Sequence, residues 1–94
     1  MYEKTLPIGS VVLLKNGNKR AMIIGYYQKM VGNQDKIYDY VGVGFPEGFI
    51  KSDALALFDH EQIETVYSIG FQDNEWSDFQ NRLLSAIQVS NGDN

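Results

Sequence analysis

Two short apolar runs on either side of an Asn-Gly pair constrain this fold more than any other feature. The runs at residues 11–14 (VVLL) and 21–24 (AMII) are apolar at every position, and a polar stretch around Asn16 and Gly17 separates them. Asn-Gly is the strongest short hairpin signal, because both central residues of a type I′ turn need positive φ. A strand that is apolar on both faces is normally covered on both faces. We therefore expect a hairpin whose sheet either curls on itself or keeps one face for a partner.

The middle of the chain adds further strands. Residues 37–45 (IYDYVGVGF) alternate better than the first two runs, and Gly42 and Gly44 on one face give room for a sharp bend. Asp59 and Gln62 have the spacing of a capping box at the start of one helical turn. The strand pattern of residues 63–71 places five side chains on one face, namely Ile63, Thr65, Tyr67, Ile69 and Phe71.

The C-terminal region predicts one long helix over residues 73–89. Asp73 or Asn74 is its expected N-cap. Four large apolar residues recur at helical spacing, namely Trp76, Phe79, Leu83 and Ile87. This stripe predicts that the helix belongs to the fold and that Trp76 is largely buried against the sheet.

The expected fold class is α+β: an antiparallel, strongly curled sheet of four or five strands with one C-terminal amphipathic helix. The sheet would resemble an SH3-like or partly open barrel. Strands are predicted at residues 10–15, 20–30, 37–45 and 63–71, and residues 54–58 fit either a short strand or a helical turn. Residues 1–89 form a single domain in this interpretation, and residues 90–94 form a disordered polar tail.

Composition argues against several functional classes. The chain has 94 residues, no cysteine, one histidine and a net charge of −4. Cysteine absence removes disulfides and thiol chemistry, and an acidic chain is poorly suited to nucleic acid. No apolar run approaches the ~20 residues that span a bilayer. Residues 1–7 show no basic segment followed by an apolar stretch, so we expect no secretory signal. We expect a cytoplasmic protein that neither inserts into membranes nor binds nucleic acid.

The candidate catalytic patterns are weak. His60 and Glu64 have the spacing of a zinc-binding helix, but the second ligand would have to be a histidine. Gly42, Gly44 and Gly48 lack the spacing of a dinucleotide-binding loop. The basic residues of the hairpin tip, Lys15, Lys19 and Arg20, favour protection of a sheet edge over nucleic-acid binding. We expect no enzyme, no metal and no cofactor.

Four tyrosines are the candidate protein-binding residues: Tyr26, Tyr27, Tyr38 and Tyr40. If the sheet stays open, they would form an exposed aromatic patch of the kind that marks protein interfaces. If the sheet closes into a barrel, both faces are buried and the patch disappears.

The pattern of residues 6–14 (LPIGSVVLL), 22–25 (MIIG), 39–43 (DYVGV), 46–48 (PEG) and 58–63 (FDHEQI) resembles a small domain-of-unknown-function family. That family belongs to Gram-positive bacteria and is encoded near type VII secretion genes, in clusters with LXG-type toxins. The resemblance implies a noncatalytic cytoplasmic accessory protein, a chaperone or targeting factor that binds an LXG-type effector. It implies no catalytic residues.

Two alternatives stay open at this stage. The protein could be an immunity protein that masks a toxin, with its acidic surface against a basic nuclease. It could instead be a small ligand-binding barrel or enzyme that uses a groove lined by the tyrosines. A homo-oligomer is compatible with each of these hypotheses.

Overall fold

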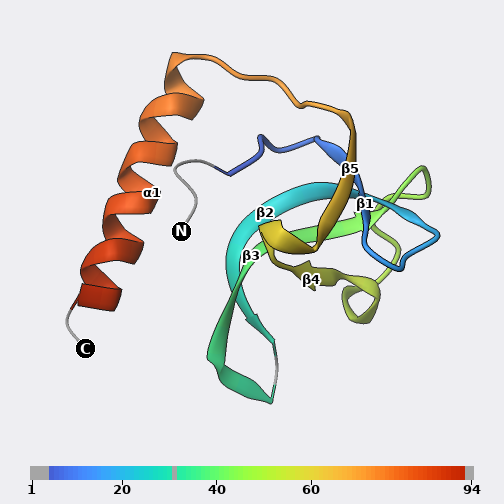
Figure 1. Cartoon of the computed structure of the whole chain (residues 1–94), viewed down its shortest axis with the longest axis horizontal. Coiled ribbons are helices and arrows are strands. Elements are labelled where there is room, and N and C mark those ends of the chain that lie inside the picture. Colours follow the sequence, from blue (N-terminus) through green and yellow to red (C-terminus); the bar gives the residue numbers. More distant parts are fainter. Residues whose placement is uncertain (1–4, 31, 93–94) are drawn as a thin grey trace.

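The computed structural model describes residues 5–30 and 32–92, which form one curled antiparallel sheet and one C-terminal helix (Figure 1). The strands are β1 (Val11–Leu14), β2 (Arg20–Met30), β3 (Asn33–Gly44), β4 (Ala56–Phe58) and β5 (Ile63–Ser68). Two short 3-10 turns, η1 (Ser52–Ala54) and η2 (His60–Gln62), flank β4, and α1 (Asn74–Gly92) is the helix. The sheet order is β4-β3-β2-β1-β5. This architecture confirms the predicted fold class, with the sheet curled as in an open barrel.

The first hairpin forms as predicted, but with a longer loop than a two-residue type I′ turn. Val12 pairs with Ala21, and the connection runs through residues 15–19. Asn16 takes φ of 65°, whereas Gly17 is not in the positive-φ region, and the Gly17 N–H donates to the Leu14 carbonyl over 3.0 Å. The turn therefore uses the left-handed conformation once, at Asn16.

Several element boundaries differ from the sequence prediction. The strand β3 begins four residues before residue 37, because Asn33 already pairs with Met30. Residues 56–58 are a strand, and β5 ends at Ser68, where it pairs with Val11 at the start of β1. The helix extends through residues 90–92, and residues 93–94 of the predicted disordered tail lie outside the described residues.

The face assignment for β5 was wrong. The register steps from the pair Leu14–Ile63 to the pair Leu13–Thr65, so β5 carries an extra residue there, and a second irregularity lies between Val11 and Val12. Ile63 consequently packs against the hydrophobic core, while Thr65 pairs with Leu13 on the other face. A β-bulge inserts one residue and so shifts the alternation.

The core lies on the concave side of the curled sheet. Its buried members come from four strands: Val12, Ala21, Ile23, Tyr26, Tyr40 and Phe58. On the opposite face Val11 and Val43 are also buried, and both pair with Met22. The apolar runs of β1 and β2 are thus partly covered on both sides, although Ile24 stays 38% exposed.

Candidate protein-binding groove

The four candidate tyrosines do not form an exposed patch. Tyr40 is 0% exposed and Tyr26 is 9% exposed, while Tyr27 and Tyr38 are partly buried. The expectation of a contiguous tyrosine surface was wrong, because the curl of the sheet turns Tyr26 and Tyr40 into the core. A role of Tyr27 and Tyr38 in binding stays a prediction.

The buried tyrosines hold the N-terminal segment, residues 5–10, against the sheet. The Leu6 N–H donates to the Tyr40 hydroxyl over 2.9 Å, and the Tyr26 hydroxyl donates to the Leu6 carbonyl over 2.6 Å. The Tyr40 oxygen also lies 2.6 Å from Nδ1 of His60. Burial raises the pKa of the Tyr40 hydroxyl well above its usual range. These hydroxyls serve the fold by satisfying both main-chain polar groups of one partly buried residue, Leu6.

The helix α1 is anchored by polar contacts at its N-terminal half and by apolar contacts of Phe79 with Tyr26 and of Leu83 with the core. Asp73 is the N-cap, because its Oδ1 accepts the Trp76 N–H over 2.9 Å. The Trp76 indole donates to the Tyr26 hydroxyl over 3.3 Å, and buried Gln80 accepts from the hydroxyl and the N–H of Thr5. Trp76 is of intermediate burial, so most of its surface is covered, as predicted, although it is not fully enclosed. The N-terminal segment, drawn in blue, crosses between the first half of the helix and the sheet (Figure 1).

This arrangement leaves a groove between α1 and β2, which we call the helix groove. It has a volume of about 580 Å³ and is lined by Ile8, Gly25, Tyr26, Tyr27, Gln28, Phe79 and Leu83. Ile8 is 45% exposed and Phe79 is 48% exposed. Side chains from three parts of the chain thus present apolar surface to solvent at one place.

Tyr27 has an unusual backbone in this groove. Its φ is 51°, an outlier for a bulky residue inside a strand. Its ring centroid lies 6.5 Å from that of Tyr26, although consecutive strand residues normally point to opposite faces. Burial, and secondarily the charge of Asp39, raise the pKa of the Tyr27 hydroxyl. Residue patterning gave no signal of this kink.

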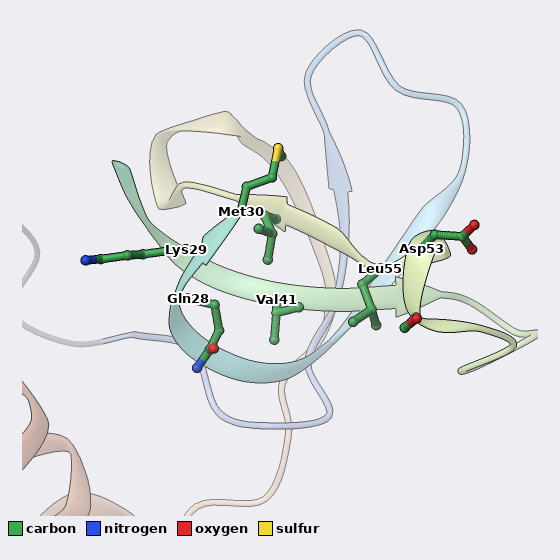
Figure 2. Close-up of a pocket in the computed structure, with 8 residues that line it drawn as sticks. Gln28, Lys29, Met30, Val41, Asp53 and Leu55 are labelled. Atoms are coloured by element: carbon green, nitrogen blue, oxygen red, sulfur yellow. The ribbon is translucent and has the colours of Figure 1, made fainter. Parts of the chain in front are cut away.

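A second groove lies beside η1 and β4, and we call it the loop groove (Figure 2). It has a volume of about 540 Å³ and is lined by Gln28, Lys29, Met30, Val41, Ser52, Asp53, Leu55 and Leu57. Val41 and Leu57 are neighbours across β3 and β4. Its apolar lining is flanked by one cation, Lys29, and one anion, Asp53.

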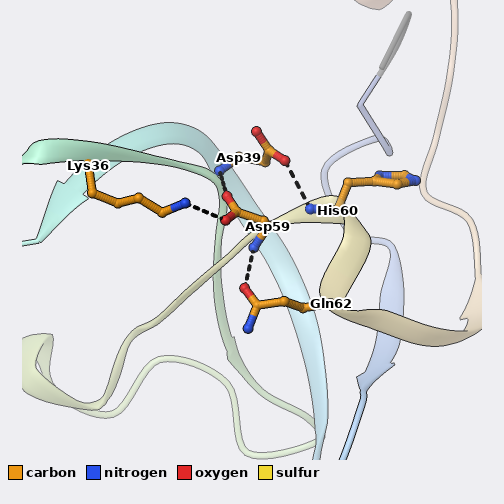
Figure 3. A network of polar contacts seen from close by, with 5 residues as sticks. All are labelled: Lys36, Asp39, Asp59, His60 and Gln62. Carbon is orange, nitrogen blue, oxygen red and sulfur yellow. Dashed lines mark hydrogen bonds and ion pairs between the residues drawn. The ribbon is translucent and has the colours of Figure 1, made fainter. Parts of the chain in front are cut away.

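The residues around His60 form a structural network (Figure 3). Asp39 Oδ2 accepts the His60 N–H over 2.9 Å, and Asp59 Oδ1 accepts the Asp39 N–H over 3.1 Å. Gln62 reaches back to the Asp59 N–H over 2.8 Å, as the capping-box spacing predicts. Lys36 pairs with Asp59 at 2.7 Å, which raises the pKa of the lysine. The network ties η2 to β3, and no group of three potential metal ligands converges within the described residues.

Two of the basic residues near the hairpin tip, Lys19 and Arg20, are engaged within the chain. Lys19 forms an ion pair with Glu47, and this contact lowers the pKa of the glutamate. The Arg20 guanidinium lies 5.1 Å from the ring centroid of Phe45 and 5.8 Å from that of Tyr67. Cation–π contacts of this kind pack a charged side chain over the outer face of a sheet.

Comparisons with known proteins place these features in a family. No helix in the described part of the chain is long and apolar enough to span a bilayer. Searches of curated proteins and of solved structures gave no match. A family model described as "Domain of unknown function (DUF4176)" matches residues 5–79, which include every strand, the N-terminal segment and the first turn of α1. The chain therefore belongs to the DUF4176 family.

Proposed function

We propose that this protein is a noncatalytic cytoplasmic accessory protein that binds an LXG-type effector of a type VII secretion system, as a chaperone or targeting factor. The observation that carries the proposal is the helix groove, where Ile8 and Phe79 are about half exposed beside Tyr27 and Leu83. The secretion context comes from the family resemblance of the sequence.

The shape and lining of the helix groove favour a protein partner over a small molecule. A small-molecule site is typically a deep pocket that buries most of its ligand and carries a few convergent polar groups. The helix groove is instead an open surface with a mostly apolar lining. Exposed apolar surface of this kind typically marks a protein contact. Aromatic residues such as Tyr27 and Phe79 are enriched in such contacts.

An immunity protein is the second candidate, and the charge of the chain supports it. The net charge of −4 would complement a basic toxin such as a nuclease. In that case the partner region would be the toxin domain at the C-terminal end of the effector rather than its LXG region.

Co-purification with an effector encoded beside this protein tests the proposal. The effector is offered as its LXG region and as its toxin region, each separately tagged. We expect capture of the LXG region by the wild-type protein, and loss of at least tenfold in affinity for Phe79→Lys, because a charge would enter the apolar groove. Capture of the toxin region alone would instead support an immunity protein.

A matched variant controls for added charge. Ile50 is 67% exposed and lies outside both grooves, so Ile50→Lys adds the same charge away from the proposed site. It should bind as the wild type does. Equal binding by Phe79→Lys and the wild type would reject the helix groove as the contact, and failure of both effector regions to bind would reject the proposed function.

A further inference from the structure

We infer that the helix groove takes an extended segment of the partner protein, which adds as a further strand to the edge of β2 at Tyr26 and Gln28 that no other described strand pairs with. The inference rests on the proposed function and specifies what the groove recognises: main-chain hydrogen-bonding groups, together with apolar side chains at alternate positions. The occupant is a strand and not a helix, because the groove runs along a strand edge.

The backbone pairing of β2 shows which way this edge faces. The Ile23 N–H donates to the Ser10 carbonyl over 2.9 Å, and the Ile23 carbonyl accepts the Gly9 N–H over 2.8 Å. The backbone groups of Ile23 therefore point away from β3, toward the N-terminal segment. Ile23 pairs with Gly42 on β3, and this pair is therefore a non-hydrogen-bonded one. The N–H and carbonyl of Gly42 consequently point away from β2.

The same alternation can be followed along β3. The N–H and carbonyl groups of successive strand residues face opposite edges, so those of Val41 point toward β2 and those of Tyr40 point away from it. The extra residue of β2 lies between Ile23 and Gly25, so the pairing resumes as Tyr26 with Tyr40 and Gln28 with Tyr38. The N–H and carbonyl groups of Tyr26 and Gln28 consequently point away from β3, on the side of the helix groove.

One side-chain contact agrees with this orientation. The Gln28 Nε2 donates to the Tyr26 carbonyl over 3.0 Å. If the Tyr26 carbonyl accepted an N–H of β3, it would already have a donor. A carbonyl at the sheet edge has no donor from a neighbouring strand, so a side chain such as Gln28 can supply one. The exposed Gln28 amide thus occupies the position that an N–H of an added strand would take. In the described residues, the pairing of β1 with β2 reaches only Met22, and residues 9 and 10 extend it to Ile23, so no described strand pairs with this edge at Tyr26 and Gln28.

The residues that line the groove fit an added strand. Four consecutive residues of β2, from Gly25 to Gln28, line it, whereas a sheet face would contribute only alternate residues. The opposite wall is α1, with Phe79 and Leu83 one turn apart. A strand in this position would pair its backbone with β2 and place alternate side chains against the helix, as in β-augmentation.

The charges around the groove define the partner further. Glu75 and Asp78 lie on α1 within one turn before Phe79, and the charge of Asp39 acts on Tyr27. The cations next to lining residues are Arg82, before Leu83 on α1, and Lys29, after Gln28 on β2, so three acidic groups stand against two basic ones. This acidic balance favours an extended segment with lysine or arginine next to its apolar residues.

A titration followed by amide NMR tests the inference on the full chain. The probe is a seven-residue peptide of alternating valine and threonine with a lysine at each end. We expect the amide signals of Tyr26 and Gln28 to move and their hydrogen exchange to slow. The same peptide with N-methylated backbone nitrogens should bind at least tenfold more weakly, because it cannot donate to β2. Glutamate in place of the lysines should weaken binding several-fold.

Variants and an effector arm separate the outcomes. Phe79→Lys should abolish the shifts, while Ile50→Lys should leave them unchanged. Shifts centred on Val41 and Leu57 in the loop groove, equal binding of the N-methylated peptide, or no binding at millimolar peptide would each overturn the inference. If an effector binds but exchange at Tyr26 and Gln28 is unchanged, strand addition is wrong while the proposed function stands. If no effector binds, the proposed function fails, and the peptide titration still decides whether a strand can add to β2.

Discussion

Removal of one buried hydroxyl, in Tyr40→Phe, tests how the N-terminal segment is held. The Tyr40 side chain is fully buried, and its oxygen accepts the Leu6 N–H at 2.9 Å and contacts His60 Nδ1 at 2.6 Å. Phenylalanine keeps the ring but removes the acceptor of the partly buried Leu6 N–H, together with one contact of His60. A buried polar group left unsatisfied costs about 1–3 kcal/mol, so we expect a loss of about 1–3 kcal/mol in the free energy of unfolding.

Urea unfolding, followed by Trp76 fluorescence, measures this loss of free energy. Thermal unfolding, followed by circular dichroism, gives the melting temperature. For a domain of this size, each kcal/mol lowers the melting temperature by about 4–8 °C, so Tyr40→Phe should melt at least about 4 °C lower. Tyr67→Phe is the control, since the Tyr67 side chain is mostly exposed, and it should stay within about 0.5 kcal/mol of the parent. A melting temperature for Tyr40→Phe within about 3 °C of the parent would refute the reasoning.

A double-mutant cycle then asks whether the two tyrosines act on one target. Tyr26→Phe removes the donor to the Leu6 carbonyl, which is the other polar group of the same residue. Once one bond is lost, Leu6 is freer to move and the second bond stabilises less. We therefore expect the combined loss to be smaller than the sum of the single losses by about 1 kcal/mol. Additive losses would mean that the two hydroxyls stabilise independent parts of the fold.

Three further predictions concern a glycine, the helix and alkaline pH. Gly70→Ala should destabilise by more than about 2 kcal/mol in thermal unfolding, because a Cβ would lie 2.0 Å from the Ile8 carbonyl oxygen; Gly32→Ala, at φ of 90° and without neighbours within 4 Å, should lose only about 1 kcal/mol. Trp76→Ala should lose about 2 kcal/mol, less than the ~3–5 kcal/mol of a fully buried tryptophan, and an unchanged melting temperature would contradict the docking of α1. The raised pKa of Tyr40 means that the neutral hydroxyl is favoured in the folded state, so its stabilisation is complete below the unfolded pKa near 10 and is lost as the pH rises above it. Absorbance at 295 nm should show this tyrosine ionising only with unfolding, and Tyr40→Phe should reduce the alkaline loss of stability.

Much of the fold could be predicted from local patterns. The Asn16-Gly17 pair and the runs beside it predict the first hairpin, and the stripe from Trp76 to Leu83 predicts the helix. The bulges of β5 could not be found in this way, because an extra residue at Glu64 follows from the pairing with β1 and leaves no mark in the residue alternation. The exchange of faces between Ile63 and Thr65 is therefore a tertiary effect.

The candidate site was harder to predict than the fold. Tyr26 and Tyr40 belong to strands that could face either side of a curled sheet, and the choice depends on which side the N-terminal segment crosses. The helix groove combines residues from three distant parts of the chain, with Ile8 and Phe79 among them. Its kink at Tyr27 is a backbone conformation that side-chain chemistry does not encode.

The contacts between the two ends of the domain have a consequence for the order of folding. Thr5 bonds to Gln80 across 75 positions, and the Ser10 hydroxyl accepts the Gly70 N–H across 60 positions. Such contacts close nearly the whole chain into a loop. The chain loses conformational entropy when its ends come together, and it does so before these contacts can stabilise the fold. On the ribosome, the N-terminal segment leaves the exit tunnel first but has to wait for α1 to emerge. We expect the segment and the helix to join the sheet together, as the last step of folding, so that substitutions at Thr5 speed unfolding and leave the folding rate almost unchanged.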